Sequence, residues 1–372
     1  MLSKEENELL TQVSPGKPMG DLMRRYWLPV LMSSELPKPD CAPMRVRLLG
    51  EDLVAFRDTD GKVGLLQANC PHRGAPLVFG RNEERGIRCI YHGWKFNTGG
   101  FCTAMPNVPT ESDYKDKVRT LAYPCVERNG LVWTYMGAQD PPPPLPTFDF
   151  GERTAEQTYY SKQFYECNWL QVLEGDFDPS HSSFLHATLA EPTAASTADQ
   201  KLDSSQRENV VRFDDRSPLI MTVQTEYGLL VGARRDAGKD YYWRLNLFAM
   251  PFYAFVPTTI DSPLHCNAWV PVDDDNTIVL RMDYHLDHPI TDDERARMMM
   301  GLGSTGAPST YLPPTQEAWG SWMPNLNRAN NYGIDRDLQR TSKYSGMRGV
   351  WAEDKAVTEG MGSVIDLSLI HI

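Results

Sequence analysis

Two short segments each pair a cysteine with a histidine, and their spacing is suited to metal binding. The first is Cys70-Pro71-His72, and sixteen residues later the second is Cys89-Ile90-Tyr91-His92. Two thiolates and two imidazoles suit tetrahedral zinc, and they also suit a [2Fe–2S] centre in which one iron takes both cysteines and the other both histidines. The spacing therefore predicts one metal site built from two loops, each supplying one ligand of each kind.

Three features near these ligands favour the iron–sulfur centre over zinc. Gly74 and Gly93 flank the ligands where the backbone must approach sulfide closely. The intervening segment is strand-forming, whereas a zinc finger would place a helix there, and Trp94 follows directly to exclude water. A zinc-stabilised binding module, which would be colourless, stays open as the alternative. The other cysteines show no ligand spacing, and we expect them to be small core residues.

A second group lies about ninety residues further on and contains Asp178, His181 and His186. Two histidines and a distant carboxylate form the facial ligand set of non-haem Fe(II), which leaves positions open for O2. On a regular α-helix, residues five apart point about 140° from each other, whereas a π-type turn brings them to roughly 50°. We therefore expect a distorted helix between the two histidines. Asp178 shares the face of His181 and is expected to orient its imidazole. Asp176 is the competing carboxylate for this role, but its spacing to His181 does not fit it.

The elements that must position these groups change character along the chain. Short strand-like runs separated by turns such as Asp60-Gly61 and Asn129-Gly130 predict a small antiparallel barrel or sandwich around the first group. Around the second group we expect a largely helical segment over 168–186, long strands over 219–234 and 241–256, and a hairpin joining 268–272 to 277–285.

We therefore predict an α+β protein in which an antiparallel sheet is flanked by helices. The proline run of residues 141–146 is expected to be a stiff spacer between two domains. The predicted organisation is N-terminal helices over 1–40 that pack on the second domain, an all-β metal domain over 41–140, the linker 141–146, and an α+β domain over 147–372.

Composition narrows the range of functions. The chain has 372 residues, 37 Lys and Arg against 49 Asp and Glu, and a net charge of −12. An acidic chain without a basic block is a poor binder of nucleic acid. No apolar run reaches the ~18 residues that span a bilayer, and the opening residues lack an apolar leader. We expect a cytoplasmic protein that binds neither nucleic acid nor membrane, with its seven cysteines reduced.

The first motif resembles the Rieske domain of ring-hydroxylating oxygenases. Neither loop carries the additional cysteine that forms a disulfide in respiratory Rieske proteins, which favours the low-potential, soluble type. The element Asp178-x2-His181-x4-His186 resembles the catalytic domain of the α subunits of that family. The resemblance implies a helix-grip (START-like) catalytic domain, a Rieske [2Fe–2S] cluster and a mononuclear Fe(II) held by both histidines. It also implies that Asp178 links His181 to His92 of another subunit.

The third iron ligand must be a carboxylate far along the chain. The segment from Glu353 to Gly362 resembles the Q-D-x4-E-x2-G element of the family, in which the Asp, here Asp354, is the ligand. Glu353 stands in place of the usual Gln. Family members continue for several tens of residues beyond the last match, so we expect the end after Asp366 to be truncated. The other candidate carboxylates are Glu353, Glu359 and Asp366.

The resemblance is closest to the phthalate dioxygenase-like branch, which implies a flavin and [2Fe–2S] reductase as partner and a homotrimer or hexamer. Members that act on diacids hold the substrate with two arginines. Arg244 falls on one of those positions, where an anionic substrate would pair with it, and a structural salt bridge is the alternative. The other position holds Leu219, for which Arg212 or Arg216 could compensate.

The sequence thus predicts the terminal oxygenase of an aromatic-ring-hydroxylating system. Electrons from NAD(P)H would arrive through the reductase, O2 would be the co-substrate, and an aromatic carboxylate such as a phthalate- or benzoate-like acid would be oxidised. One alternative is a monooxygenase or O-demethylase of a methoxylated aromatic acid. Outside this class, the alternative is an electron-transfer Rieske protein, which would not need the second group of ligands.

Overall fold

The computed structural model describes residues 2–190, 197, 201–259, 262–302, 308, 310–318 and 320–367. Of the segment after Asp366, residues 368–372 lie outside these residues. The helices and strands, in chain order, are α1 (Lys4–Thr11), α2 (Pro18–Met23), β1 (Trp27–Met32), β2 (Met44–Leu48), β3 (Glu51–Arg57), β4 (Val63–Gln67), β5 (Arg81–Glu83), β6 (Gly86–Arg88), β7 (Lys95–Phe96), β8 (Cys102–Ala104), β9 (Ala122–Tyr123), β10 (Cys125–Arg128), β11 (Leu131–Tyr135), β12 (Thr158–Tyr165), α3 (Trp169–Phe177), α4 (Ser204–Asp214), β13 (Leu219–Thr225), β14 (Gly228–Asp236), β15 (Tyr241–Ala249), β16 (Tyr253–Val256), β17 (Leu264–Pro271), β18 (Thr277–Tyr284), α5 (Asp292–Met299), α6 (Arg336–Thr341) and α7 (Val350–Gly360).

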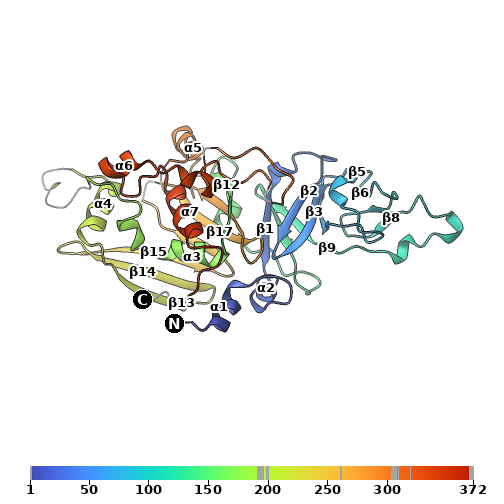
Figure 1. Ribbon diagram of the computed structural model, residues 1–372, viewed down its shortest axis with the longest axis horizontal. Coiled ribbons are helices and arrows are strands. Elements are labelled where there is room, and N and C mark those ends of the chain that lie inside the picture. Colours follow the sequence, from blue (N-terminus) through green and yellow to red (C-terminus); the bar gives the residue numbers. More distant parts are fainter. Residues whose placement is uncertain are drawn as a thin grey trace.

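A seven-stranded antiparallel sheet dominates the larger part of the molecule, with the order β12-β18-β17-β16-β15-β14-β13. Helices α3 and α7 lie against the sheet (Figure 1). The expected hairpin around residues 273–276 is confirmed, because Pro271 pairs with Thr277 at its end. The α+β class predicted from the sequence is confirmed.

The prediction of one long strand over 219–234 and another over 241–256 is wrong, because each segment folds back on itself. The first segment turns between Thr225 and Gly228, so that β13 pairs with β14. The second turns between Ala249 and Tyr253, so that β15 pairs with β16. Pro251 cannot donate a ladder hydrogen bond, which favours the second turn, while the first turn has little sequence signal besides its glycine.

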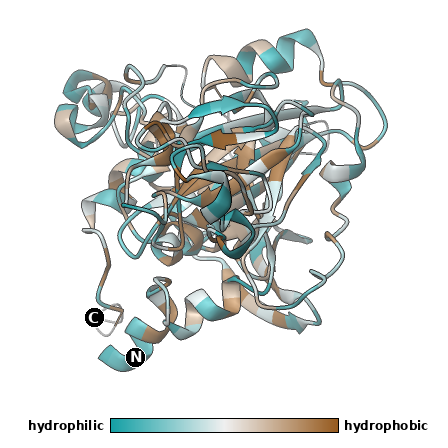
Figure 2. Ribbon diagram, turned by 90° about the vertical axis from the view of Figure 1, so that its right-hand side faces the viewer, coloured by the Kyte–Doolittle hydropathy of each residue, from teal (hydrophilic) through white to brown (hydrophobic). Residues whose placement is uncertain are grey.

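The smaller part of the molecule is built from short antiparallel strands in three sheets, with the orders β1-β11-β10, β2-β3-β4-β9 and β5-β6-β7-β8. A separate core fills the space between these strands beside Cys70 and Cys89, and it includes Phe56, Leu77 and Phe96. Strands β5, β6 and β8 lie toward the end of the molecule away from α3 and α7, whereas β1 lies beside the large sheet (Figure 1). Figure 2 looks at the molecule from that end and shows apolar strands in the centre with polar loops around them.

The prediction of N-terminal helices over 1–40 is wrong beyond Met23, where α2 ends, because residues 27–32 form β1 and pair with β11. The segment after α1 is bonded to the large sheet and to α3. The carboxylate of Asp274, in the β17–β18 turn, accepts hydrogen bonds from the backbone N–H groups of Val13 and Ser14. The side chain of Asn168, which caps α3, donates to the carbonyl of Thr11. The start of the chain is therefore tied to the helix that leads to the histidine pair. None of the described helices is both long and apolar enough to pass through a bilayer.

Candidate metal centres and substrate pocket

The two cysteine–histidine loops have the same backbone geometry. In the first loop, the Cys70 N–H donates to the Ala75 carbonyl at 2.8 Å and the Gly74 N–H donates to the Cys70 carbonyl at 2.9 Å. In the second, the Cys89 N–H donates to the Trp94 carbonyl at 2.8 Å and the Gly93 N–H donates to the Cys89 carbonyl at 3.0 Å. Both glycines have positive φ, +72° and +75°, which favours glycine at these positions.

The four predicted ligands differ in burial. The two cysteines are buried, and the centroids of the partly exposed His72 and His92 rings lie 4.5 Å apart. Trp94 stacks on His72 with 4.3 Å between ring centroids, so it shields one face of the site. Burial raises the pKa of the Cys70 thiol to about 11, so metal binding at this site would release a proton.

The spacing of these four ligands argues against a single zinc ion. Around one tetrahedral ion, ligand atoms about 2.0–2.3 Å from the metal lie less than ~4 Å from one another. No three ligand atoms from this set lie within 4.8 Å of one another, although all four residues are described. A cluster with two iron atoms needs the wider spacing that the structure shows.

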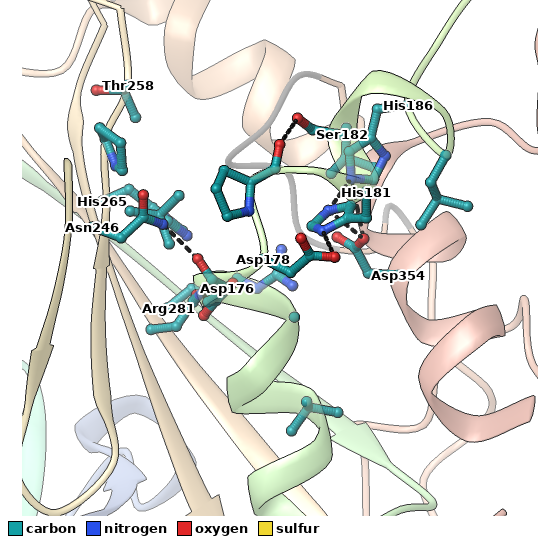
Figure 3. Close-up of a pocket in the computed structure, with 18 of the residues that line it drawn as sticks. Asp176, Asp178, His181, Ser182, His186, Asn246, Thr258, His265, Arg281 and Asp354 are labelled. Carbon is teal, nitrogen blue, oxygen red and sulfur yellow. Dashed lines mark hydrogen bonds and ion pairs between the residues drawn. The ribbon is translucent and has the colours of Figure 1, made fainter. Parts of the chain in front are cut away.

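A different triad does converge on one point. The Nε2 atoms of His181 and His186 lie 3.1 Å apart, and the Asp354 Oδ1 atom lies 3.1 Å from the His186 Nε2 and 3.8 Å from the His181 Nε2. Ligands about 2.1 Å from an octahedral metal occupy adjacent positions about 3.0 Å apart. The triad therefore fits three adjacent positions of one ion and leaves the other positions open (Figure 3).

The helix that approaches this triad ends earlier than expected. The prediction of a largely helical segment over 168–186 is wrong beyond Phe177, where α3 stops. Asp178 precedes a proline and has extended backbone angles, because the residue before proline disfavours the helical region. A 3-10 turn, His181–Ser183, then brings the two histidines together. The predicted distortion is confirmed, but it is a helix end and a tight turn instead of a π-type turn.

Each histidine of the triad has a second carboxylate behind it. The His186 Nδ1 lies 2.7 Å from the Glu353 Oε2, and the Glu353 side chain is fully buried and also accepts a hydrogen bond from the Ser345 hydroxyl. The His181 Nδ1 lies 3.6 Å from the Asp178 Oδ2. The sequence analysis placed Glu353 among the possible ligands, but the structure turns it to the far side of His186. In the sequence, the presence of Glu353 where the family motif has Gln was the signal that this residue has a role other than metal binding.

The side chains around the triad are mainly acidic. Burial lowers the pKa of His186, but the carboxylates of Asp354 and Glu353 outweigh this effect and raise that pKa to about 9. Burial raises the pKa of Asp178, yet hydrogen bonds from His181 and Ser180 hold it well below its usual range. The site is therefore suited to a divalent cation.

Helices α3 and α7 are fastened to each other beside the triad. The Gln171 side chain, on α3, donates to the carbonyls of Thr358 and Gly362 at 2.5 and 2.8 Å and accepts from the Ile365 N–H. This link joins the helix that leads to the histidines with the helix that carries Asp354. No motif in the sequence points to Gln171.

An arginine supports the histidine loop from the sheet. Arg235, on β14, is 1% exposed and donates to the Pro179 carbonyl at 2.7 Å and to the Asp215 carbonyl at 3.0 Å. Burial and the neighbouring guanidinium of Arg212 lower the pKa of Arg235. Sequence reasoning missed this residue, because an arginine at the end of a strand carries no specific signal.

Asp176, the competing carboxylate, has a structural position. Its Oδ2 accepts hydrogen bonds from Asn267 at 2.9 Å and from the Trp269 indole at 2.6 Å, and burial raises its pKa. It fastens the end of α3 to β17 and lies outside the triad.

A cavity of about 850 Å³ opens beside the triad, between the sheet and helices α3, α4 and α7. Figure 3 shows the triad on one side of this cavity and His265, Asn246 and Arg281 on the sheet side. The predicted substrate-binding residue Arg244 lines the cavity, and its guanidinium lies 2.5 Å from the Glu208 carboxylate. The salt bridge that the sequence analysis kept as an alternative is thus present.

The remaining positions considered for substrate binding, Leu219, Arg212 and Arg216, differ in whether they reach the cavity. Leu219 is half exposed on the edge strand β13. Arg212 lines the same cavity as Arg244, whereas Arg216 lies over the rings of Phe184 and Phe213. Of the two arginines that could compensate for Leu219, Arg212 is therefore the one that reaches the cavity.

Comparison with known families covers nearly the whole chain. Residues 26–123 match the Rieske [2Fe-2S] domain, and residues 134–370 match the family described as "LigXa C-terminal domain like". The 3-chlorobenzoate-3,4-dioxygenase oxygenase subunit of Comamonas testosteroni is 37% identical over 99% of this chain and 84% of its own length. The chain belongs to the Rieske ring-hydroxylating oxygenases, as an α subunit. Its cofactors are accordingly a Rieske [2Fe–2S] cluster and a mononuclear iron that works with O2.

Two further comparisons agree with this membership. The phthalate 4,5-dioxygenase oxygenase subunit of Pseudomonas putida is 34% identical over 99% of this Rieske oxygenase and 81% of its own length. Among solved structures, dicamba monooxygenase bound to 3,6-dichlorosalicylic acid has a TM-score of 0.56 at 18% identity, covering 76% of this chain and 85% of its own. The second match shows a shared fold. This Rieske oxygenase is the terminal oxygenase of an aromatic ring-hydroxylating or demethylating system.

Proposed function

We propose that this protein oxidises an aromatic carboxylate, such as a phthalate- or benzoate-like acid, with electrons that a flavin and [2Fe–2S] reductase takes from NAD(P)H. Cys70, His72, Cys89 and His92 would hold the cluster, and His181, His186 and Asp354 would hold the iron. When bound, the cluster supplies single electrons and the iron activates dioxygen. The observation that carries the proposal is the open triad at the edge of a cavity whose lining also includes arginines.

Charge in the cavity supports an anionic substrate. Arg212 and Arg244 line it, Arg235 lies close enough to both for their charges to lower its pKa, and Glu208 pairs with Arg244. An aromatic carboxylate could accept hydrogen bonds from these guanidiniums, which bind planar anions well. The relatives named for 3-chlorobenzoate and phthalate, both aromatic acids, agree with this substrate class.

The arrangement within one chain supports an assembly of several copies. The cluster loops and the triad lie toward opposite ends of the molecule (Figure 1), and the Asp178 side chain beside His181 is about half exposed. We propose a homotrimer or hexamer in which Asp178 connects His181 with His92 of a neighbouring subunit. Asp178 would then hold His181 in place and provide the hydrogen-bonded route between the two metal sites.

A second function within the class is O-demethylation of a methoxylated aromatic acid. The 5,5'-dehydrodivanillate O-demethylase oxygenase subunit of Sphingobium sp. (strain NBRC 103272 / SYK-6) is 44% identical over 191 residues, 50% of this chain and 44% of its own length. The metal ligands are the same for both reactions, so only the products separate them. A cis-dihydrodiol indicates dioxygenation, and formaldehyde released from a methoxylated acid indicates demethylation.

The test begins with iron, acid-labile sulfide and zinc per chain in anaerobically purified protein. We expect about three irons and two sulfides, because one cluster and one mononuclear site are proposed. His181→Ala should lose one iron and all product formation while it keeps the visible spectrum of the cluster. Zinc without sulfide, or turnover by His181→Ala with a reductase, would overturn the proposal.

A further inference from the structure

A buried histidine–carboxylate pair lies in the sheet wall of the substrate cavity. His265, on β17, lines the cavity, and its Nδ1 lies 2.7 Å from the Oδ1 of Asp283 on β18. The two side chains are 4% and 0% exposed. Because a carboxylate accepts, the hydrogen of the ring is held on Nδ1. None of the hydrogen bonds of the described part of the chain uses Nε2, so Nε2 is the ring atom left for a ligand.

The other hydroxyl groups and side-chain amide N–H groups described on this wall have partners within the protein. The Thr258 hydroxyl donates to the Pro263 carbonyl at 2.9 Å, and the Thr259 and Ser262 hydroxyls pair at 2.7 Å. The side-chain amides of Asn246 and Asn267 donate to Asp176. The Asn267 Oδ1 has no hydrogen-bond partner, but an amide oxygen can only accept, so His265 is the group here whose remaining ring nitrogen could accept or donate.

Charge distinguishes this wall from the end of the cavity that Arg212 and Arg244 line, here called the arginine end. Two buried carboxylates, Asp176 and Asp283, lie next to His265, and the guanidinium of Arg281 lies close enough to Asp176 to act on its pKa. At the arginine end, the positive side chains outnumber Glu208, as described above. The carboxylate of a substrate is thus favoured at the arginine end, and a second anionic group beside His265 would be repelled.

A hydroxyl group is the substituent that suits the Nε2 atom of His265. A hydroxyl can donate to a neutral Nε2 and can accept from a protonated one, whereas an ether oxygen only accepts. β17 lies two strands away from β15, which carries Arg244, so the two ends are separated by about 10 Å across the sheet. An aromatic ring system with a carboxylate at one end and a hydroxyl at the other spans such a distance.

We propose that His265, oriented by Asp283, is a specificity-determining residue that binds a ring hydroxyl of the substrate, so that the preferred substrates are hydroxylated aromatic acids. This inference rests on the proposed function, because it assumes that an aromatic acid occupies the cavity. Asp283 is a positioning residue in this arrangement, since it acts only through the histidine ring.

The experiment measures binding by calorimetry, without dioxygen and therefore without turnover. The iron-loaded protein is titrated with benzoate, the three hydroxybenzoate isomers and a benzenedicarboxylate. The variants are His265→Phe, which keeps a ring but lacks Nε2, His265→Gln as a second variant if the first misfolds, and Asp283→Asn. Thr258→Val is the matched control on the same wall, because its hydroxyl is already bonded within the protein.

We expect at least one hydroxybenzoate to bind about tenfold more tightly than benzoate, which corresponds to one hydrogen bond in a desolvated site. This preference should disappear in His265→Phe and His265→Gln, shrink in Asp283→Asn and persist in Thr258→Val, in which the affinity for benzoate should also stay at the wild-type value. A preference that survives loss of the His265 side chain, or a dicarboxylate that alone depends on His265, overturns the inference while the proposed function stands. If no aromatic acid binds, the proposed function fails and the inference fails with it.

Discussion

The His186 Nδ1 lies 2.7 Å from a fully buried carboxylate of Glu353, the residue that immediately precedes the proposed iron ligand Asp354. Two adjacent residues of α7 therefore contribute in different ways. Asp354 is the proposed ligand, and Glu353 supports the proposed ligand His186 from the opposite side of its ring. A hydrogen bond to a carboxylate fixes the tautomer of a metal-binding imidazole and increases its basicity. Glu353 makes this support anionic, where the family motif has a neutral glutamine.

This relationship predicts the effect of Glu353→Gln on iron affinity. The substitution keeps the shape and an oxygen acceptor for His186 but removes the charge, so we expect Fe(II) to bind roughly 10-fold to 100-fold more weakly. Competition with a chelator measures the affinity, and the absorption of Co(II) bound in place of iron reports the ligand field. Asp178→Asn is the comparison, with a smaller expected loss because that carboxylate lies 3.6 Å from its histidine and is half exposed. Equal affinities for wild type and Glu353→Gln would contradict this role.

The two matched cluster loops predict unequal effects for the same substitution. Gly74 and Gly93 have nearly the same positive φ, but a Cβ atom at Gly74 meets nothing within 4 Å, whereas one at Gly93 would lie 2.5 Å from the Pro106 ring. Gly74→Ala should cost about 1–2 kcal/mol in the free energy of unfolding from backbone strain. Gly93→Ala should cost more and should also loosen the cluster. Thermal melts followed at the visible absorption of the cluster test this order, which an equal loss in both variants would refute.

Arg235 predicts a coupling between the sheet and the histidine loop. Arg235→Met keeps much of the buried volume but leaves the carbonyls of Pro179 and Asp215 without their donor, at a cost of about 1–3 kcal/mol each in stability. Because Pro179 lies two residues before His181, iron retention should fall as well. Arg340→Met is the control, since the Arg340 side chain is 75% exposed and lies outside the histidine loop. The prediction is wrong if Arg235→Met melts earlier but retains iron like wild type.

A buried ion pair behind the triad gives the last prediction. Lys355 and Glu359 are both fully buried one helical turn apart, and Lys355 also donates to the Phe164 carbonyl at 2.7 Å. Lys355→Met should cost about 3–5 kcal/mol, because it leaves a carboxylate buried without its cation. Adding Glu359→Gln should restore part of that loss. Urea unfolding measures both changes, and strictly additive losses in the double variant would show that the pair is not coupled.

Much of the candidate site could be predicted from the sequence because its ligands lie in short motifs. The cysteine–histidine loops and the segment from Asp178 to His186 are local patterns, and Asp354 stands inside a recognisable element of the family. The distortion between the two histidines also followed from helix geometry, although its form depends on Pro179. Local patterns are visible in a sequence because the chain itself brings their members together.

The residues that support the site could not be predicted in this way. Gln171 meets α7 from almost two hundred residues away, and His265 meets Asp283 only through the register of β17 with β18. The strands over 219–256 were predicted too long for a related reason, since apolar runs do not show where a chain turns back. Such contacts depend on tertiary packing, which a single sequence does not specify locally.

The link that Gln171 makes between α3 and α7 has a consequence for the assembly of the triad. The two histidines follow α3 and Asp354 lies on α7, so hydrogen bonds between protein groups alone hold the elements that carry all three ligands. Part of the entropic cost of gathering the ligands would then be met by folding and not by the metal. Loss of this link would weaken metal binding from a distance, with every ligand still present.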